Sequence, residues 1–242
     1  NSEGVMAGCA RLLPLAPDAL LLSFREGAEE WDAGVVARRA RCYKARVTDP
    51  EDSAAVDGVE RCQAALAGAH QALYRPVCPE LNQENWFQVL GCRSVRESLE
   101  CGVLVLHAES ADGQVAGYVS CSCTFAPGDA RPAEAAGGHG AEGPHAKINH
   151  LAVLPEHRGQ GVGRLLMAEL LEHLNTACPS VAADLRLRVA QRNSCAKDWY
   201  QRLGFVAGQC VEAACGPFPV AFVEMRRLAG GAGDEPTEEG GG

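Results

Sequence analysis

Two short segments of the chain contain residues whose types and spacing could do chemistry. The first is RGQGVG, residues 158–163, which leads from a predicted strand into an amphipathic helix. Its glycines lack Cβ atoms and let an oxygen-rich ligand approach the main chain, where the N–H groups and positive end of the helix would bind a pyrophosphate. A tight turn with close helix packing would explain the same glycines. Arg164 stands where a dinucleotide-binding motif needs a third glycine, and no P-loop ending follows, so both of those motifs are disfavoured.

The second segment is LRLRVAQRNSCAKDWYQRLGF, residues 185–205, which predicts a strand, an Asn, a short helix and a Leu-Gly-Phe exit. Together the two segments resemble the GCN5-related N-acetyltransferase (GNAT) superfamily, whose motifs are Arg/Gln-x-x-Gly-x-Gly/Ala and Asn-x-x-Ala-x-x-x-Tyr-x-x-x-Gly-Phe. The matching positions are Arg158, Gly161, Gly163, Asn193, Ala196, Tyr200, Gly204 and Phe205. The resemblance is close over residues 148–205 and extends in element order from about Leu20 to Arg227.

The resemblance implies acetyl-CoA as co-substrate, with its pantetheine arm paired to an exposed strand and its pyrophosphate on the loop amides. The residues that would bind it are Leu151, Ala152, Val153, Arg158, Gly159, Gln160, Gly161, Val162, Gly163, Arg164, Asn193 and Tyr200. Asn193 would lie near the arm, although its position before a helix also suits an N-cap, and it can serve both purposes.

The resemblance implies that Tyr200 is a general acid that protonates the departing CoA sulfur, although its helical spacing also suits ordinary core packing. An alkylamine acceptor must lose a proton at a cost of about 4 to 5 kcal/mol at pH 7. Many relatives carry Glu or His where this chain has Asn149, which could hold only a water. His150 is the other candidate, but strict alternation turns it away from Lys147 and Asn149 unless a bulge redirects it.

The acceptor is expected to be a primary amine of a small molecule or a peptide. Residues 24–43 and 207–225 resemble the arylalkylamine (serotonin) N-acetyltransferase branch, although its paired strand histidines correspond to Lys147 and Asn149 here. One alternative is a protein N-terminal or lysine acetyltransferase, which the LRLRV strand resembles except that its usual histidine is Arg188. Another alternative is a catalytically silent acyl-CoA-binding module, which would account for the missing base.

Composition narrows the class of protein. The 242 residues carry 22 Lys+Arg and 31 Asp+Glu, a net charge of −9 that argues against nucleic-acid binding and suits cationic partners such as amines. Twelve cysteines lie between Cys9 and Cys215 without a CxxC pair, which favours buried, reduced thiols over a metal site and predicts a cytoplasmic location. Cys121 and Cys123 would share one strand face. No apolar stretch reaches the roughly 18 residues of a membrane helix.

The elements that must position these residues follow from hydrophobic periodicity and turn residues. Strands are predicted at 20–25, 102–108, 114–125, 147–154, 184–190, 205–212 and 219–227, and helices at 29–45, 56–74, 84–99, 161–177 and 194–203. This order predicts an α/β (α+β) fold with a mixed sheet of about six to seven strands flanked by helices, and the resemblance implies that this is the GNAT fold. The predicted organisation is an arm at 1–19, a domain at 20–228 with a flexible insertion at 126–144, and a disordered acidic tail at 229–242.

Overall fold

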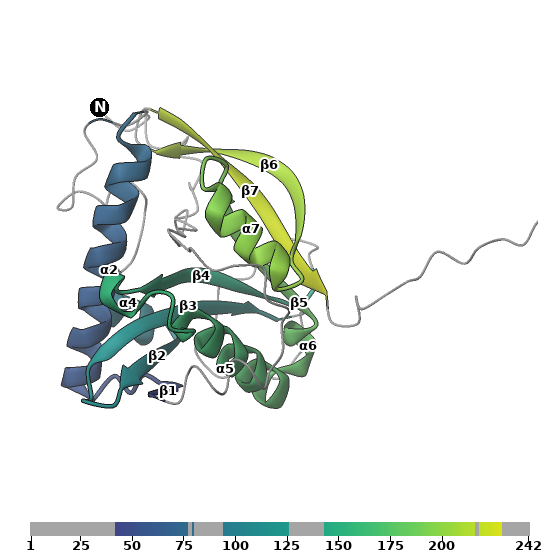
Figure 1. The fold of residues 1–242 in the computed structure, drawn as a ribbon. Helices are drawn as coiled ribbons and strands as arrows, with labels where there is room; N and C mark the ends of the chain where they lie inside the picture. The colour runs from purple at the N-terminus through teal and green to yellow at the C-terminus, as the bar shows by residue number, and fades with distance from the viewer. Residues whose placement is uncertain (1–41, 77–78, 80–93, 126–142, 216–217, 229–242) are drawn as a thin grey trace, which may run out of the picture.

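The computed structural model describes residues 42–76, 79, 94–125, 143–215 and 218–228, which form one seven-stranded sheet with helices on both faces (Figure 1). The strands are β1 (Tyr43–Val47), β2 (Leu104–Ser110), β3 (Val115–Thr124), β4 (His145–Val153), β5 (Asp184–Ala190), β6 (Val206–Cys215) and β7 (Phe218–Leu228). The helices are α2 (Ser53–Tyr74), α4 (Val95–Glu100), α5 (Val162–Ala177), α6 (Pro179–Ala182) and α7 (Ser194–Arg202), with a 3-10 turn, η1, at Pro155–His157.

The sheet has the order β1-β2-β3-β4-β5-β7-β6. Every neighbouring pair of described strands is antiparallel except β4 and β5, which run parallel and are connected through α5 and α6. The predicted mixed sheet with a single crossover is therefore confirmed. The predicted hairpin around Asp112 and Gly113 is also confirmed: it joins β2 to β3, and Gly113 has φ +79°, a backbone conformation that glycine adopts at little cost.

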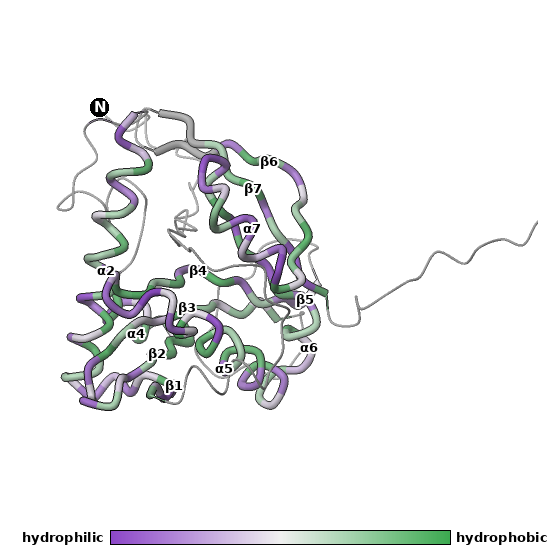
Figure 2. Tube along the Cα trace, in the orientation of Figure 1, coloured by the Kyte–Doolittle hydropathy of each residue, from purple (hydrophilic) through white to green (hydrophobic). Residues whose placement is uncertain are grey.

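Two apolar clusters lie on the two faces of the sheet. The apolar side of α5, together with α7, packs on one face, and Leu166, Leu170 and Leu174 are buried there as their spacing predicts. The buried side of α2 packs against β3 and β4 on the other face, through Val59 and Leu66 among others. Figure 2 shows the hydrophobic and hydrophilic residues alternating along α2.

The helix α2 approaches the sheet closely at one glycine. A Cβ atom built on Gly58 would lie 2.4 Å from Cγ2 of Val115 on β3, which is far closer than real atoms approach. A Cβ atom built on Gly68, in the same helix, would meet nothing within 4 Å. Gly58 therefore sets the distance between α2 and β3, whereas Gly68 does not.

The N-terminal side of the described domain differs from the prediction. A helix was expected to run to Ala45, but Tyr43–Val47 is the edge strand β1, antiparallel to β2. Tyr43 and Ala45 alternate inward onto the core, so pairing with β2 overrides the weak helical pattern of this segment. The predicted strand 20–25 lies outside the described residues, and of the predicted helix 84–99 only the end is described, as part of α4.

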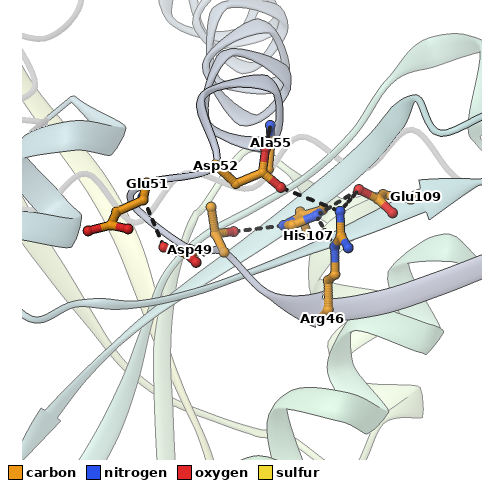
Figure 3. Close-up of polar contacts among 8 residues, drawn as sticks. Arg46, Asp49, Glu51, Asp52, Ala55, His107 and Glu109 are labelled. Carbon is orange, nitrogen blue, oxygen red and sulfur yellow. Dashed lines mark hydrogen bonds and ion pairs between the residues drawn. The ribbon is translucent and has the colours of Figure 1, made fainter.

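A polar cluster around the buried side chain of His107 also fastens β1 to β2 and α2 (Figure 3). His107 on β2 accepts a hydrogen bond at Nε2 from Arg46 Nε (3.1 Å), and its Nδ1 lies 2.8 Å from Thr48 Oγ1. Arg46 also pairs with Glu109 and lies 3.6 Å from Asp52, whose carboxylate caps α2 at Ala55. Burial lowers the pKa of His107, which favours the neutral ring that these bonds require.

The described cysteines are all free, and half of them are at the surface. Cys42, Cys101, Cys195 and Cys210 are exposed, which contradicts the expectation that the thiols are buried. Cys121 lies in the core and Cys123 packs against the same cluster, so the predicted shared face is confirmed. Within the described ranges, no helix is long and apolar enough to cross a membrane. The predicted arm 1–19, tail 229–242 and nearly all of the insertion 126–144 lie outside the described residues.

Candidate functional site

The parallel strands β4 and β5 pair only where they begin. Their register comprises Ala146 opposite Leu185 and Lys147 opposite Arg186, after which β4 continues against β3 to Val153 and β5 continues against β7. Among the described strands none pairs with this edge of β4 over residues 148–153. The two halves of the sheet therefore open like a wedge, visible in Figure 1, and the main chain at Leu151–Val153 can pair with an extended ligand.

A bulge in β4 changes the direction of two polar side chains beside this opening. Ser120 of β3 lies opposite His150 and Cys121 opposite Ile148, so Asn149 is the extra residue on β4. Asn149 Nδ2 donates to Ser122 Oγ (2.5 Å), and His150 Nδ1 lies 3.2 Å from Ser120 Oγ. Both side chains thus lie on the face that carries α2. Strict alternation was wrong for His150, because the bulge shifts the side-chain period by one residue.

Tyr118 lies beside His150 on this face, and further buried aromatic rings lie at the end of α2 and on β7. The ring centroids of Tyr118 and His150 are 6.3 Å apart, those of His70 and Tyr74 on α2 are 5.6 Å apart, and those of Tyr74 and Phe222 on β7 are 6.2 Å apart. Burial, with the nearby His150 second, lowers the pKa of His70 to about 3, so that ring is neutral near pH 7. The end of α2 and β7 thus form an aromatic wall on the α2 side of the wedge.

The glycine-rich loop after β4 ends in a helix N-terminus that lacks a side-chain cap. Gly159 and Gly161 have φ +74° and +84°, which explains why glycine stands at both positions. Gly161 is the N-cap of α5 and provides no side chain, while Val162, Gly163 and Arg164 of the first turn are buried. Arg164 is 8% exposed, and its Nε has no hydrogen-bond partner within the described part of the chain. Buried donors at a positive helix end suit a phosphate group.

Two other side chains of this motif are bonded to the protein itself. Arg158 Nε donates to the main-chain oxygen of Val153 (3.1 Å), which fixes the loop to the end of β4. Gln160 Nε2 donates to the main-chain oxygen of Glu156 (2.9 Å), and its Oε1 accepts from the hydroxyl of Tyr43 (2.7 Å). Gln160 therefore offers a ligand its main chain rather than its side chain.

The second motif lies on α7, which packs on the same face as α5. Asn193 Oδ1 accepts from the main-chain N–H of Ala196 (3.1 Å), which confirms the N-cap. Its Nδ2 is buried and has no hydrogen-bond partner among the described residues. Tyr200 is fully buried, with its ring 5.0 Å from that of Trp199 and 5.3 Å from that of Phe205. Tyr200 and His150 thus lie on opposite faces of the sheet.

Residues 100–207 match the family model described as Acetyltransferase (GNAT) domain, and this range contains the wedge and both motifs. Over this range the chain carries a GNAT acetyltransferase domain. It is an acyltransferase whose acetyl donor is acetyl-CoA, and the mixed sheet flanked by helices is the fold that the motifs predict.

Solved structures similar to this GNAT protein come from several organisms. A GCN5-related N-acetyltransferase from Kribbella flavida is 19% identical (TM-score 0.47), with 78% of this chain and 99% of that chain covered. Chaetomium thermophilum Naa20 in complex with a bisubstrate analogue is 21% identical (TM-score 0.46; 76% and 86% covered). Arabidopsis thaliana NAA60 in complex with a bisubstrate analogue is 15% identical (TM-score 0.49; 78% and 99% covered). A search of curated proteins finds no match.

Sequence reasoning missed several residues that line or contact the candidate site. Tyr43 was assigned to a helix, and His70 was treated only as part of the second helix. Ser120 and Ser122 stand two residues apart in a segment with a clear strand pattern, so they share one face of the sheet. This spacing could have marked them as partners of residues on the next strand. The contact of Tyr43 with Gln160 has no sequence signal, because 117 residues separate the two.

Proposed function

We propose that this protein transfers an acetyl group from acetyl-CoA directly to the primary amine of a small arylalkylamine. The observation that carries the proposal is the wedge between β4 and β5, with the uncapped N-terminus of α5 at its side. An extended thioester could pair with β4 there while its phosphates meet buried donors.

The donor would be held along the path from the loop to the wedge. Main-chain N–H groups of Gly159 to Arg164 would bind the pyrophosphate, and the unpartnered Nε of Arg164 would add a charge-assisted bond. The main chain of Leu151, Ala152 and Val153 would pair with the pantetheine arm. The unpartnered Nδ2 of Asn193 would donate to a carbonyl of that arm, which would satisfy an otherwise costly buried amide.

Tyr200 would supply a proton to the CoA sulfur as the amine attacks the thioester carbonyl. The amine nitrogen forms the new C–N bond, the C–S bond breaks, and the departing thiolate takes the phenol proton. Burial between Trp199 and Phe205 holds the phenol in one orientation, which supports this role. The attacking amine would release one proton to solvent on the other side of the sheet, and the phenolate of Tyr200 would take one proton back from solvent.

A water held by Asn149 would accept the amine proton. Asn149 Nδ2 is engaged by Ser122, so its orientation is fixed and its Oδ1 is directed away from that bond as an acceptor for a water. His150 lies on the same face because of the bulge and is the alternative acceptor. The pH dependence of variants at these two positions distinguishes them.

The aromatic wall supports an acceptor with an aryl group. Tyr74, Tyr118 and Phe222, together with neutral His70, would pack against an aromatic ring on the α2 side, where the bulge residues lie. We therefore place arylalkylamines before peptides among the acceptors.

Free CoA release from acetyl-CoA tests the proposal, with an acceptor panel of phenylethylamine, tryptamine, alkylamines and peptides bearing a free α-amine or a lysine. The expected result is the highest kcat/KM for an arylalkylamine. A Gly161→Asp variant is the control, because its carboxylate would meet the pyrophosphate and abolish acetyl-CoA binding in a folded protein. Preference for peptides would overturn the acceptor class, and binding without turnover of any amine would indicate a silent acyl-CoA-binding module.

A further inference from the structure

The edge strand β1 contacts the glycine-rich loop through a single side chain. The hydroxyl of Tyr43 donates to Gln160 Oε1 (2.7 Å) and lies 3.0 Å from His157 Nδ1. The Tyr43 and His157 rings also meet edge to face, with centroids 5.8 Å apart. These three side chains join segments that are more than 100 residues apart in the sequence. Tyr43 and His157 lie outside both GNAT motifs, and Gln160 occupies a position of the first motif at which any residue is allowed.

The hydrogen-bond directions are determined by the groups available. A phenol has one hydrogen, and because Tyr43 gives it to Gln160, the His157 Nδ1 carries the hydrogen that points back to the phenol oxygen. The amide of Gln160 donates in turn to the main chain at Glu156. The turn η1 and the residue between the two left-handed glycines are thus fastened to β1 by a continuous chain of bonds.

We propose that Tyr43 is a positioning residue for acetyl-CoA, which orders the pyrophosphate loop before the ligand arrives. This inference rests on the acetyl-CoA site proposed above. Gly159 and Gly161 give the loop a large choice of backbone conformations, and ordering such a segment at the moment of binding would weaken affinity. Tyr43 holds Gln160, which lies between those glycines, and so keeps the loop N–H groups directed at the phosphates.

The position of Tyr43 in the fold does not require its hydroxyl. Its ring packs against the core on the α5 face, while Arg46 and Thr48 fasten the same strand to His107 on the opposite face. Tyr43→Phe would keep the ring packing and remove only the bonds to Gln160 and His157. Arg46→Gln would remove β1 side-chain contacts, to His107, Glu109 and Asp52, that do not reach the loop, and it is the matched control.

The first test measures acetyl-CoA binding by calorimetry and the steady-state kinetics of the full chain. Tyr43→Phe should raise Kd and KM for acetyl-CoA about three- to tenfold, the range for loss of one hydrogen bond, and leave kcat at saturating acetyl-CoA unchanged. Arg46→Gln should leave the Kd for acetyl-CoA unchanged. Wild-type affinity in Tyr43→Phe would overturn the proposal. A wild-type protein that did not bind acetyl-CoA would instead overturn the proposed function, and this inference with it.

The second test asks whether Tyr43 acts through Gln160. Gln160→Leu should weaken acetyl-CoA binding about as much as Tyr43→Phe. The loss of affinity in the double variant should be clearly smaller than the sum of the two single losses, because both changes break the Tyr43–Gln160 bond, while each also breaks one bond of its own, to His157 or to Glu156. Reciprocal coupling also predicts that acetyl-CoA slows amide hydrogen exchange in β1 of the wild type and does so much less in Tyr43→Phe. Additive losses of affinity, or equal protection of β1 in both proteins, would refute the positioning role.

Discussion

Asn193 can be tested for two separate roles because its two side-chain atoms have different surroundings. Its Oδ1 caps α7 at Ala196, whereas its Nδ2 is buried without a partner in the described part of the chain. Loss of the cap would destabilise the protein, while loss of the Nδ2 donor would weaken only the binding of acetyl-CoA. A substitution that keeps the first atom's role and removes the second separates them.

Asn193→Ser is that substitution, because Ser ranks with Asn as an N-cap but lacks the amide donor. The free energy of unfolding should stay within about 0.5 kcal/mol of wild type for Asn193→Ser and fall by about 0.5 to 2 kcal/mol for Asn193→Ala. Removal of the donor should cost both variants about 0.5 to 1.5 kcal/mol of acetyl-CoA binding, or roughly a two- to tenfold rise in Kd.

The measurements are denaturant unfolding without ligand and calorimetry with acetyl-CoA. A third variant, Asn193→Asp, keeps a capping oxygen but turns the donor into an acceptor. It should bind acetyl-CoA more weakly than Asn193→Ser, because a carboxylate oxygen would then face the carbonyl of the pantetheine arm. If Asn193→Ser and Asn193→Asp both bound acetyl-CoA like the wild type, Asn193 would be a cap only, and its assignment to the cofactor site would be wrong.

Further predictions concern catalysis and packing. Tyr200→Phe keeps the buried ring and should bind acetyl-CoA normally while kcat falls about 100-fold or more; full kcat would reduce Tyr200 to core packing. In the wild type, kcat/KM should rise with pH toward the pKa of the acceptor amine, near 10 for an alkylamine. Asn149→Leu should lower kcat/KM, and His150→Gln should leave its pH profile unchanged. The opposite pattern would make His150 the base. Gly58→Ala should lower the free energy of unfolding by about 0.5 to 2 kcal/mol, because the cost of overpacking against Val115 exceeds the gain in helix propensity. Gly68→Ala should raise it by about 0.5 to 1 kcal/mol. Equal effects of the two variants in denaturant unfolding would contradict the close approach of α2 to β3.

The sequence by itself determined the elements and motifs whose signals are local. The strand β5, the helix α5 and the helix α7 lie within a few residues of their predicted bounds, because each combines a clear hydrophobic period with a start or stop residue. The two motifs lie on those same elements, which is why the family and the acetyl donor could be recognised without coordinates. The cap at Asn193 was also predictable, because an N-cap involves residues only three positions apart.

Only the tertiary structure decided the features that depend on pairing between distant segments. Tyr43–Val47 is a strand because it pairs with β2, and the pattern of its own five residues is too weak to predict a strand. Asn149 and His150 share a face because β4 contains one residue more than β3 opposite it, and an extra residue in a register cannot be seen in either strand alone. The bond from Tyr43 to Gln160 exists because the fold brings together residues 117 positions apart, and the interaction energy of such a pair leaves no trace in local composition.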